Sequence, residues 1–261
     1  MTESRGRTIL HGALGLGGIV VVWALAATTV FADKAIPTPW GVLAGFADDG
    51  ARFYVNNFAG TVKEASLGFL WGNLIALALA AVVLLVPVFE KVITQVAVIS
   101  YCVPIVAIVP ILYIILGGAE GPGDASPTAV VLAAISVFFT TVVGAVLGFR
   151  SADATSLDVV SVYGGGRWKQ MSKVQLMSAL PYIVSALQIA APAAFLGAIL
   201  GEYIGGVDRG VGPALINAQQ NLDVERAWGI MFVCALVAGA AYALLGLLGR
   251  VVTPWSTGRT A

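Results

Sequence analysis

Charged residues are scarce in this sequence. Only 11% of its 261 residues are Asp, Glu, Lys or Arg, whereas 59% are hydrophobic and the mean hydropathy is +0.92. A soluble domain carries roughly 25% charged residues, so too few charges remain to cover a water-facing surface. The formal net charge is zero, which excludes the basic surface that nucleic-acid binding requires. The composition therefore indicates an integral membrane protein.

Histidine and cysteine are nearly absent. His11 is the single histidine, and the two cysteines, Cys102 and Cys234, both lie within apolar runs. These three residues cannot form a metal cluster, because their spacing matches none that metal ligands use. No cofactor and no metal is therefore expected on this chain. We expect both cysteines to be free, buried and inert thiols.

Motifs for nucleotide hydrolysis and acid–base catalysis are also missing. The sequence GGGRWK lacks the G-x-x-x-x-G-K-[ST] spacing of a P-loop, and neither a Ser/His/Asp set nor a catalytic carboxylate pair can be assembled. No long apolar run carries a charge near its centre, where ion-coupled carriers usually hold their coupling ion. We therefore predict that the chain is not an enzyme, and that energy for uphill transport would come from a partner.

Long apolar runs are abundant, and each has about 20 residues or more, enough for a helix to cross roughly 30 Å of hydrocarbon. The sequence predicts an all-α integral membrane protein, a single domain over 1–261 with six transmembrane helices. Arg5 and Arg7 precede the first run, which we interpret as a retained span because no cleavage site follows it. The six runs cover residues 9–31, 65–89, 92–116, 128–149, 174–201 and 227–249.

The distribution of basic residues predicts the orientation. With the N-terminus inside, nine of the 14 Lys and Arg residues fall in inside segments and five fall outside. Of the 14 acidic residues, four lie inside and ten lie outside. Both termini and the segment 150–181 are therefore expected in the cytoplasm.

Small residues recur four positions apart within three of the runs. The pairs are Gly68 with Gly72, Gly144 with Gly148, and Gly197 with Gly201. Such spacing lets helix backbones approach closely in lipid, so we expect these glycines to lie in helix–helix contacts. For the polar Asn73 we expect an interhelical hydrogen bond.

The one long polar segment between two apolar runs covers residues 150–181. Residues 157–163 predict a short helix, for which Ser156 is the candidate N-cap. Three successive glycines, 164–166, then permit a sharp reversal. A second, amphipathic helix is expected to open at Arg167 and to run into Pro181.

Two interpretations of this hinged pair are equally compatible with its residues. The first helix could dock into a groove on a cytoplasmic protein, with Tyr163 and Trp168 as anchors and Arg167 and Lys169 as complementary charges. Alternatively, the segment could be an amphipathic loop that lies on anionic lipid.

The segment resembles the EAA loop in permease subunits of bacterial ABC importers. That family pattern is E-A-A, three residues, Gly, nine residues, Ile, one residue and Leu-Pro. At the same spacing this chain has Asp158-Val159-Val160, Gly164, Val174 and Leu176-Met177. Asp replaces Glu, Val-Val replaces Ala-Ala, and Met177 stands where the family has Pro.

Flanking motifs are similar to those of sulfonate/nitrate/taurine-type permeases, and the resemblance extends over residues 36–250. These motifs are I-P-T-P at 36–39, G-x-x-R-W-K-Q at 164–170, L-P-Y-I at 180–183, G-E-Y-I at 201–204 and G-V-G-P-A-L-I at 210–216.

The resemblance implies a permease whose loop couples it to a separate cytoplasmic ABC ATPase, which would bind ATP and Mg²⁺. It also implies an external solute-binding protein and a second permease copy, identical or closely related. By position in the motif, the coupling residues would be Asp158, Tyr163, Gly164, Gly165, Arg167 and Trp168.

The solute pathway is expected to draw on the third and fifth runs, near Tyr101, Pro104, Gln188 and Glu202. Two other classes of function remain open. A stand-alone secondary carrier or channel would work without an ATPase and respond to an ion gradient. A membrane scaffold or assembly factor would bind partners and transport nothing.

Overall fold

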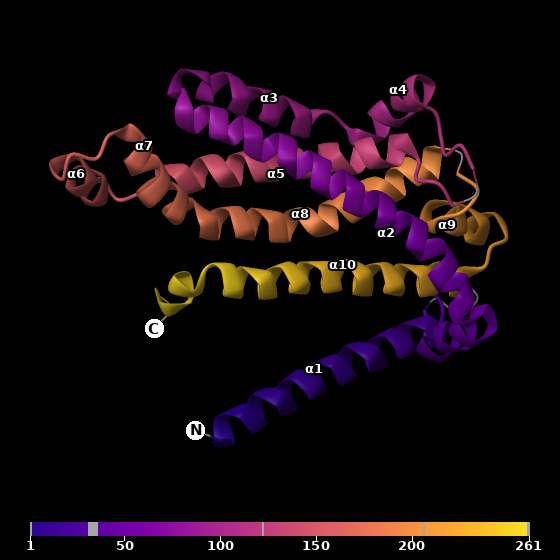
Figure 1. Ribbon diagram of the computed structural model, residues 1–261. Helices are drawn as coiled ribbons and strands as arrows, with labels where there is room; N and C mark the ends of the chain where they lie inside the picture. The colour runs from indigo at the N-terminus through magenta and orange to yellow at the C-terminus, as the bar shows by residue number, and fades with distance from the viewer. Residues whose placement is uncertain (1, 31–35, 122, 206, 260–261) are drawn as a thin grey trace. The chain divides into compact units, whose positions relative to one another are not determined.

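The computed structural model describes residues 2–30, 36–121, 123–205 and 207–259 (Figure 1). Within these residues the regular structure is helical and contains no strand, which confirms the all-α prediction. The principal helices are α1 (Thr2–Thr29), α2 (Pro39–Leu85), α3 (Glu90–Cys102), α4 (Ile105–Leu116), α5 (Pro127–Arg150), α6 (Ala154–Val162), α7 (Arg167–Gln170), α8 (Leu176–Ile204), α9 (Val211–Gln220) and α10 (Val224–Val252).

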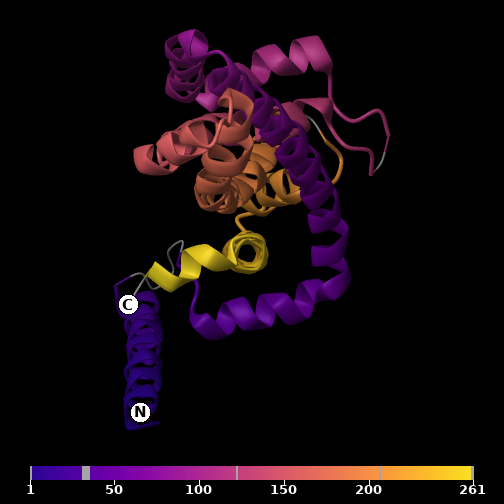
Figure 2. The same cartoon turned by 60° about the vertical axis from the view of Figure 1, so that its left-hand side comes forward.

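Five of the helical stretches are long and apolar enough to cross a membrane, and a bent pair of helices provides a sixth candidate. The bent pair replaces the single span predicted over 92–116. Its two parts, Pro87–Cys102 and α4, meet at an angle of 95° (Figure 2). Val103 is extended, with φ −74° and ψ 124°, because a residue that precedes proline disfavours the helical region. Pro104 therefore separates α3 from α4.

The chain divides into two compact units. One consists of Met1–Val55 and Ala214–Cys234, and the other of Asn56–Pro213 and Ala235–Ala261. In the second unit α5 and α8 run side by side, with α6 and α7 beyond their ends (Figure 1). This helix pair carries the polar segment that the sequence singled out.

Glycines bring α5 and α8 into backbone contact. A Cβ atom added at Gly148 would lie 2.9 Å from Ala179 Cα, and one added at Gly197 would lie 2.8 Å from the carbonyl oxygen of Leu132. Gly201 likewise packs on the backbone of Ala129. Real Cβ atoms do not approach backbone atoms this closely, so these positions have no room for a larger residue. The expectation that the spaced glycines serve helix packing is confirmed.

The contact between α2 and α5 contains a buried polar pair. Thr141 Oγ1 donates to Asn73 Oδ1 at 2.5 Å, and Asn73 Nδ2 donates to the carbonyl oxygen of Phe69 at 2.7 Å. Both side chains are buried, so each needs the partner that the other supplies. The predicted interhelical hydrogen bond of Asn73 is confirmed.

Both cysteines are free thiols, as expected. Their predicted burial is wrong for Cys102, which is exposed, whereas Cys234 is half-buried. Cys102 is the last residue of α3. An apolar residue at an exposed position of a membrane helix needs no protein partner, because lipid chains cover it.

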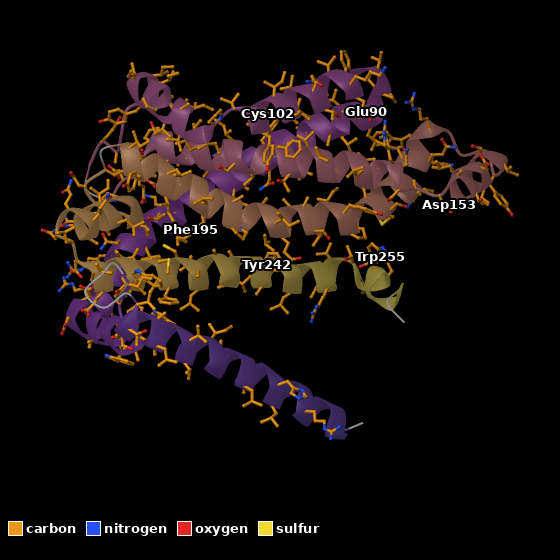
Figure 3. The ribbon with its side chains drawn as sticks, turned by 180° about the vertical axis from the view of Figure 1, so that it is seen from behind. Glu90, Cys102, Asp153, Phe195, Tyr242 and Trp255 are labelled. Carbon is orange, nitrogen blue, oxygen red and sulfur yellow. The ribbon has the colours of Figure 1, made fainter. Side chains whose placement is uncertain are left out.

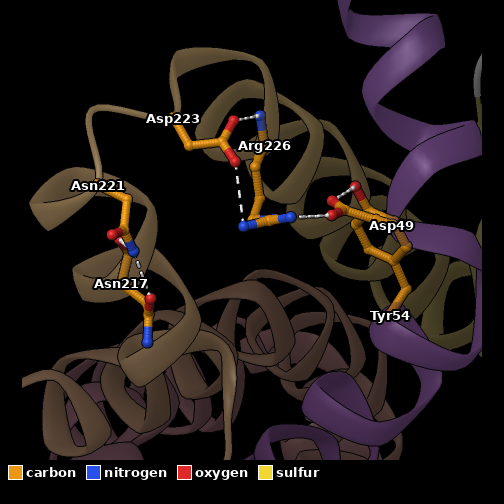
Figure 4. A network of polar contacts seen from close by, with 6 residues as sticks. All are labelled: Asp49, Tyr54, Asn217, Asn221, Asp223 and Arg226. Atoms are coloured by element: carbon orange, nitrogen blue, oxygen red, sulfur yellow. Dashed lines mark hydrogen bonds and ion pairs between the residues drawn. The ribbon is translucent and has the colours of Figure 1, made fainter.

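In the first unit a charged network joins the N-terminal part of α2 to the start of α10 (Figure 4). Arg226 Nε and Nη2 contact Asp49 Oδ1 at 2.7 and 2.6 Å. Asp223 accepts from the backbone N–H and from Nη1 of Arg226 at 3.1 and 3.0 Å. Tyr54 donates to the other oxygen of Asp49 at 3.1 Å. The Asp49 side chain is only 3% exposed, so its charge depends on these partners.

We expect Asp49→Ala to lower the free energy of unfolding by about 1–2 kcal/mol, because it removes charge-assisted hydrogen bonds whose arginine is partly solvated. Asp48→Ala is the matched control, since Asp48 is the neighbouring acid and is exposed. Thermal unfolding of the detergent-solubilised variants measures both effects. Equal stability of the two variants would contradict a structural role for this network.

Candidate coupling loop

The first helix of the polar segment, α6, begins earlier than the sequence predicted. Its N-cap is Asp153, whose Oδ2 accepts from the backbone N–H of Ser156 at 3.0 Å and from the Ser156 hydroxyl at 3.1 Å. The prediction that Ser156 caps the helix is therefore wrong. Aspartate is a strong N-cap because its carboxylate accepts from the unpaired N–H groups of the first turn.

Glycines end α6 as the sequence predicted. Gly164 has φ +73°, a left-handed conformation that glycine adopts without a steric penalty. The N–H of Gly165 donates to the carbonyl oxygen of Val160 at 2.7 Å, and the N–H of Gly164 donates to that of Ser161 at 2.9 Å. These two bonds define a Schellman motif. Gly165 also lies so close to Val160 that an added Cβ would be 2.6 Å from its carbonyl oxygen.

A side chain of α7 holds the two short helices together. Gln170 Nε2 donates to the carbonyl oxygen of Leu157 at 3.0 Å and to Ser161 Oγ at 2.7 Å. Gln170 was not predictable from the sequence, because its partners are nine and 13 residues earlier in the chain and only the reversal at the glycines brings them together. The Gln170 amide therefore fixes the angle between α6 and α7.

The tip of this hinged pair exposes large apolar side chains. Tyr163 is 86% exposed, Val162 84% and Trp168 69%. Asp158 and Arg167, both exposed, add charge of each sign. Aromatic anchors with flanking charges are typical of the contact regions of protein interfaces. The structure thus gathers the predicted coupling residues on one protruding segment.

Ion pairing and packing support the base of the loop. Arg150, the last residue of α5, forms an ion pair with Glu90 at the start of α3. Behind α6 lies a cavity of about 250 Å³, whose lining includes Phe149, Arg150 and Gln170. Figure 3 shows Glu90, Asp153 and Trp255 toward one end of this unit and Phe195 toward the other. Within this unit, Glu90, Asp153 and Trp255, which come from three segments predicted to lie inside, are therefore at one end.

The transition from α7 into α8 is a wide turn. Met171–Gln175 is π-helical, and the backbone N–H of Leu176 donates to the carbonyl oxygen of Met171. Such wide turns occur frequently at functional sites. Met177, at the position where the EAA pattern has proline, lies in the first turn of α8.

The described residues thus present a Gly-capped helix pair between two long apolar helices. Residues 72–258 match the model of the family described as binding-protein-dependent transport system inner membrane component. The chain belongs to this family.

Relatives of this permease include a probable ABC transporter permease protein of Haemophilus influenzae, which is 26% identical over 90% of this chain and 93% of its own length. A putative aliphatic sulfonates transport permease protein of Bacillus subtilis is 24% identical over 94% of this chain and 87% of its own. A formylaminopyrimidine transport permease protein of Halalkalibacterium halodurans is 20% identical over 91% and 92%.

The structure places the four candidate pathway residues of this permease in different surroundings. Tyr101, on α3, is exposed and stacks on Phe139 of α5, and Pro104 lies at the nearby break. Gln188 and Glu202 lie 14 residues apart on α8, roughly 21 Å at 1.5 Å per residue. The four residues therefore do not form one compact site within this chain.

Glu202, near the C-terminal end of α8, belongs to a buried polar cluster. Its Oε1 accepts from Thr61 Oγ1 at 2.6 Å, and its Oε2 accepts from the backbone N–H of Gly212 at 2.8 Å. Thr61 Oγ1 also accepts from the backbone N–H of Val211 at 3.0 Å. This permease thus uses Glu202 to attach the start of α9 to α2 and α8.

A second acid of the same cluster, Glu64, was missed by sequence analysis. Its Oε1 accepts from the backbone N–H of Ser126 at 2.6 Å, directly before α5. Glu64 precedes an apolar run, where acids are usually solvated. A helical signal was nevertheless present, because Thr61, Glu64, Gly68 and Gly72 are three or four residues apart and so share one face of α2.

Proposed function

We propose that this chain is the transmembrane permease subunit of an ATP-driven importer. In this proposal α6 docks on a separate cytoplasmic ABC ATPase, which binds ATP and Mg²⁺, and an external binding protein delivers the solute. A second permease copy completes the pathway. The observation that carries the proposal is the protruding, Gly-capped α6 with exposed Tyr163 and Trp168.

The coupling residues we assign are Asp158, Tyr163, Gly164, Gly165, Arg167 and Trp168. The aromatic side chains would fill apolar depressions of the ATPase, and the charges would set the register. The glycine cap, the Gln170 bridge and the Arg150–Glu90 ion pair would transmit movement of α6 to α5, α8 and α3. Rigid connections are required, because a flexible loop would absorb the displacement.

We also propose that both termini and the α6–α7 loop lie on the cytoplasmic side of the inner membrane, in line with the basic-residue bias. The proposed cargo is a small organic solute. Support for that class comes from the relatives, of which two are named for aliphatic sulfonates and formylaminopyrimidine.

Co-purification tests the proposal. A tagged chain is isolated from its native membranes in mild detergent, and mass spectrometry identifies the proteins that follow it. We expect an ABC ATPase in about equal amount, and we expect Tyr163→Ser with Trp168→Ser to release it. Asp48→Asn, at an exposed site outside the loop, serves as the control.

One outcome would contradict the importer, and a second would contradict only the assigned docking site. Solute flux through the purified chain alone in liposomes, driven by an ion gradient, would establish a stand-alone carrier or channel. Retention of the ATPase by the double variant would mean that α6 and α7 do not form the docking site.

A further inference from the structure

Two buried carboxyl groups face one another at the end of α8 remote from α6. Glu64 is 2% exposed and Glu202 is 1% exposed, and the two carboxyl groups interact with one another. Among the described residues, no basic side chain forms an ion pair with either acid. Two adjacent, buried carboxylates repel one another and lose hydration, so both cannot be ionised at once.

The hydrogen bonds distinguish the two acids. Both oxygens of Glu202 accept from donors, the Thr61 hydroxyl and the Gly212 N–H. Glu64 Oε1 accepts from the Ser126 N–H, whereas its Oε2 is buried and meets no donor in the part of the chain that the structure describes. Buried polar atoms rarely lack a partner. The group that faces Glu64 is another acceptor, so the missing component is a hydrogen atom.

We propose that Glu64 and Glu202 together form a binding site for one proton. The proton resides on Oε2 of Glu64 and is donated to the carboxylate of Glu202. This arrangement gives the unpartnered oxygen a hydrogen bond and leaves both Glu202 oxygens as acceptors for their existing donors. It also reduces the buried charge of the pair from two to one. The site is independent of the proposed ATPase coupling.

The bound proton stabilises the segment that leads into α9. The carboxylate of Glu202 lies against Gly210, where an added Cβ would be 2.5 Å from Oε1. It also binds the Gly212 N–H, while Thr61 binds the Val211 N–H. Release of the proton would put a second negative charge beside Glu202 and weaken the contact between α2 and this segment.

The charged side chains that neighbour the cluster's residues in the sequence are exposed. They are Lys63 on α2, Glu120 and Asp124 before α5, and Asp208 and Arg209 before α9. Lys63 acts on Glu64 and favours its ionised form. Its charge is screened by solvent, whereas burial of Glu64 favours its protonated form.

Infrared spectroscopy of the full chain in nanodiscs detects the proton directly. We expect the wild-type protein at neutral pH to show the C=O stretching band of a protonated carboxyl, with the downshift expected in D₂O. Glu64→Gln should abolish this band and leave the helical amide signal unchanged. The side-chain amide that this substitution introduces supplies an oxygen for the Ser126 N–H and an N–H for Glu202, so the variant should fold.

Thermal unfolding supplies a second, independent readout. The stability of the wild-type protein should fall as pH rises, because the folded pair retains a proton that the unfolded chain releases. Glu64→Gln should remove this pH dependence. Glu202→Gln should instead lower the melting temperature at every pH, because the amide keeps only one oxygen, so either the Thr61 hydroxyl or the Gly212 N–H loses its present acceptor.

Three results would overturn the proposal. The first is a wild-type spectrum without the protonated-carboxyl band, which would mean that a water molecule, and not a proton, partners Oε2 of Glu64. The second is a band that survives both substitutions. The third is wild-type stability that depends on Na⁺ or K⁺ in place of pH, which would identify a metal cation between the carboxyls. None of these tests measures ATPase binding, so the proton site and the proposed importer function are tested independently.

Discussion

Gly201→Ala should lower the free energy of unfolding of the solubilised chain by about 1–3 kcal/mol, the usual effect of overpacking a tight contact. The expected sign is opposite to helix propensity, since alanine is about 1 kcal/mol better than glycine within a helix. The added methyl group would overlap the Cα of Ala129 on α5 and lie 3.0 Å from its Cβ and N. Backbone atoms cannot rotate away, so α5 and α8 would have to separate.

Gly239→Ala is the matched control. Gly239 lies within α10, and an added Cβ meets nothing within 4 Å, so alanine there should leave stability unchanged or raise it. Fluorescence-detected size exclusion after heating measures both variants. If Gly201→Ala were as stable as Gly239→Ala, the close contact between α5 and α8 would not exist in solution.

Helix contacts of this kind were predictable, whereas helix breaks were less so. Spacing of four residues between small side chains identified Gly148, Gly197 and Gly201, because a helix repeats its faces at that interval. Hydropathy alone placed a single helix over 92–116. The 95° bend at Val103 and Pro104 follows from a local rule, but its size depends on how α3 and α4 pack against α5.

At the coupling loop, the sequence predicted the chain reversal but not the side chains that hold it in place. Consecutive glycines identified the end of α6, since few other residues adopt a positive φ. Gln170 and Glu90 each depend on a partner that is distant in the chain, whereas the Asp153 cap is local and was overlooked in favour of Ser156. Glu64 was missed for a different reason. Its position before an apolar run suggested solvation, whereas packing of α2 places it against Glu202.

Gly164→Val should strongly reduce ATP-driven uptake. Gly164 has φ +73°, and a non-glycine residue in the left-handed region is disfavoured by roughly 1–2 kcal/mol, more for a β-branched one. That energy corresponds to about a tenfold shift away from the observed cap. Loss of the cap would break the bonds from Gly164 and Gly165 to Ser161 and Val160. Movement of the ATPase would then turn α6 without displacing α5 and α8.

Gly166→Val is the matched control, because it tests whether the loop is sensitive to any bulky residue. Gly166 has φ −71° and ψ 175°, which valine adopts readily, and an added Cβ there meets nothing within 4 Å. Uptake and ATPase stimulation by the binding protein are measured on both variants in proteoliposomes that contain the whole importer. Gly164→Val should lose both activities while the ATPase still co-purifies, and Gly166→Val should keep them. Normal uptake with normal stimulation in Gly164→Val would mean that the glycine cap transmits nothing. The exposed side chains of Tyr163 and Trp168 are present in both variants. A loss of uptake in Gly164→Val alone would therefore mean that coupling requires the rigid glycine cap in addition to docking.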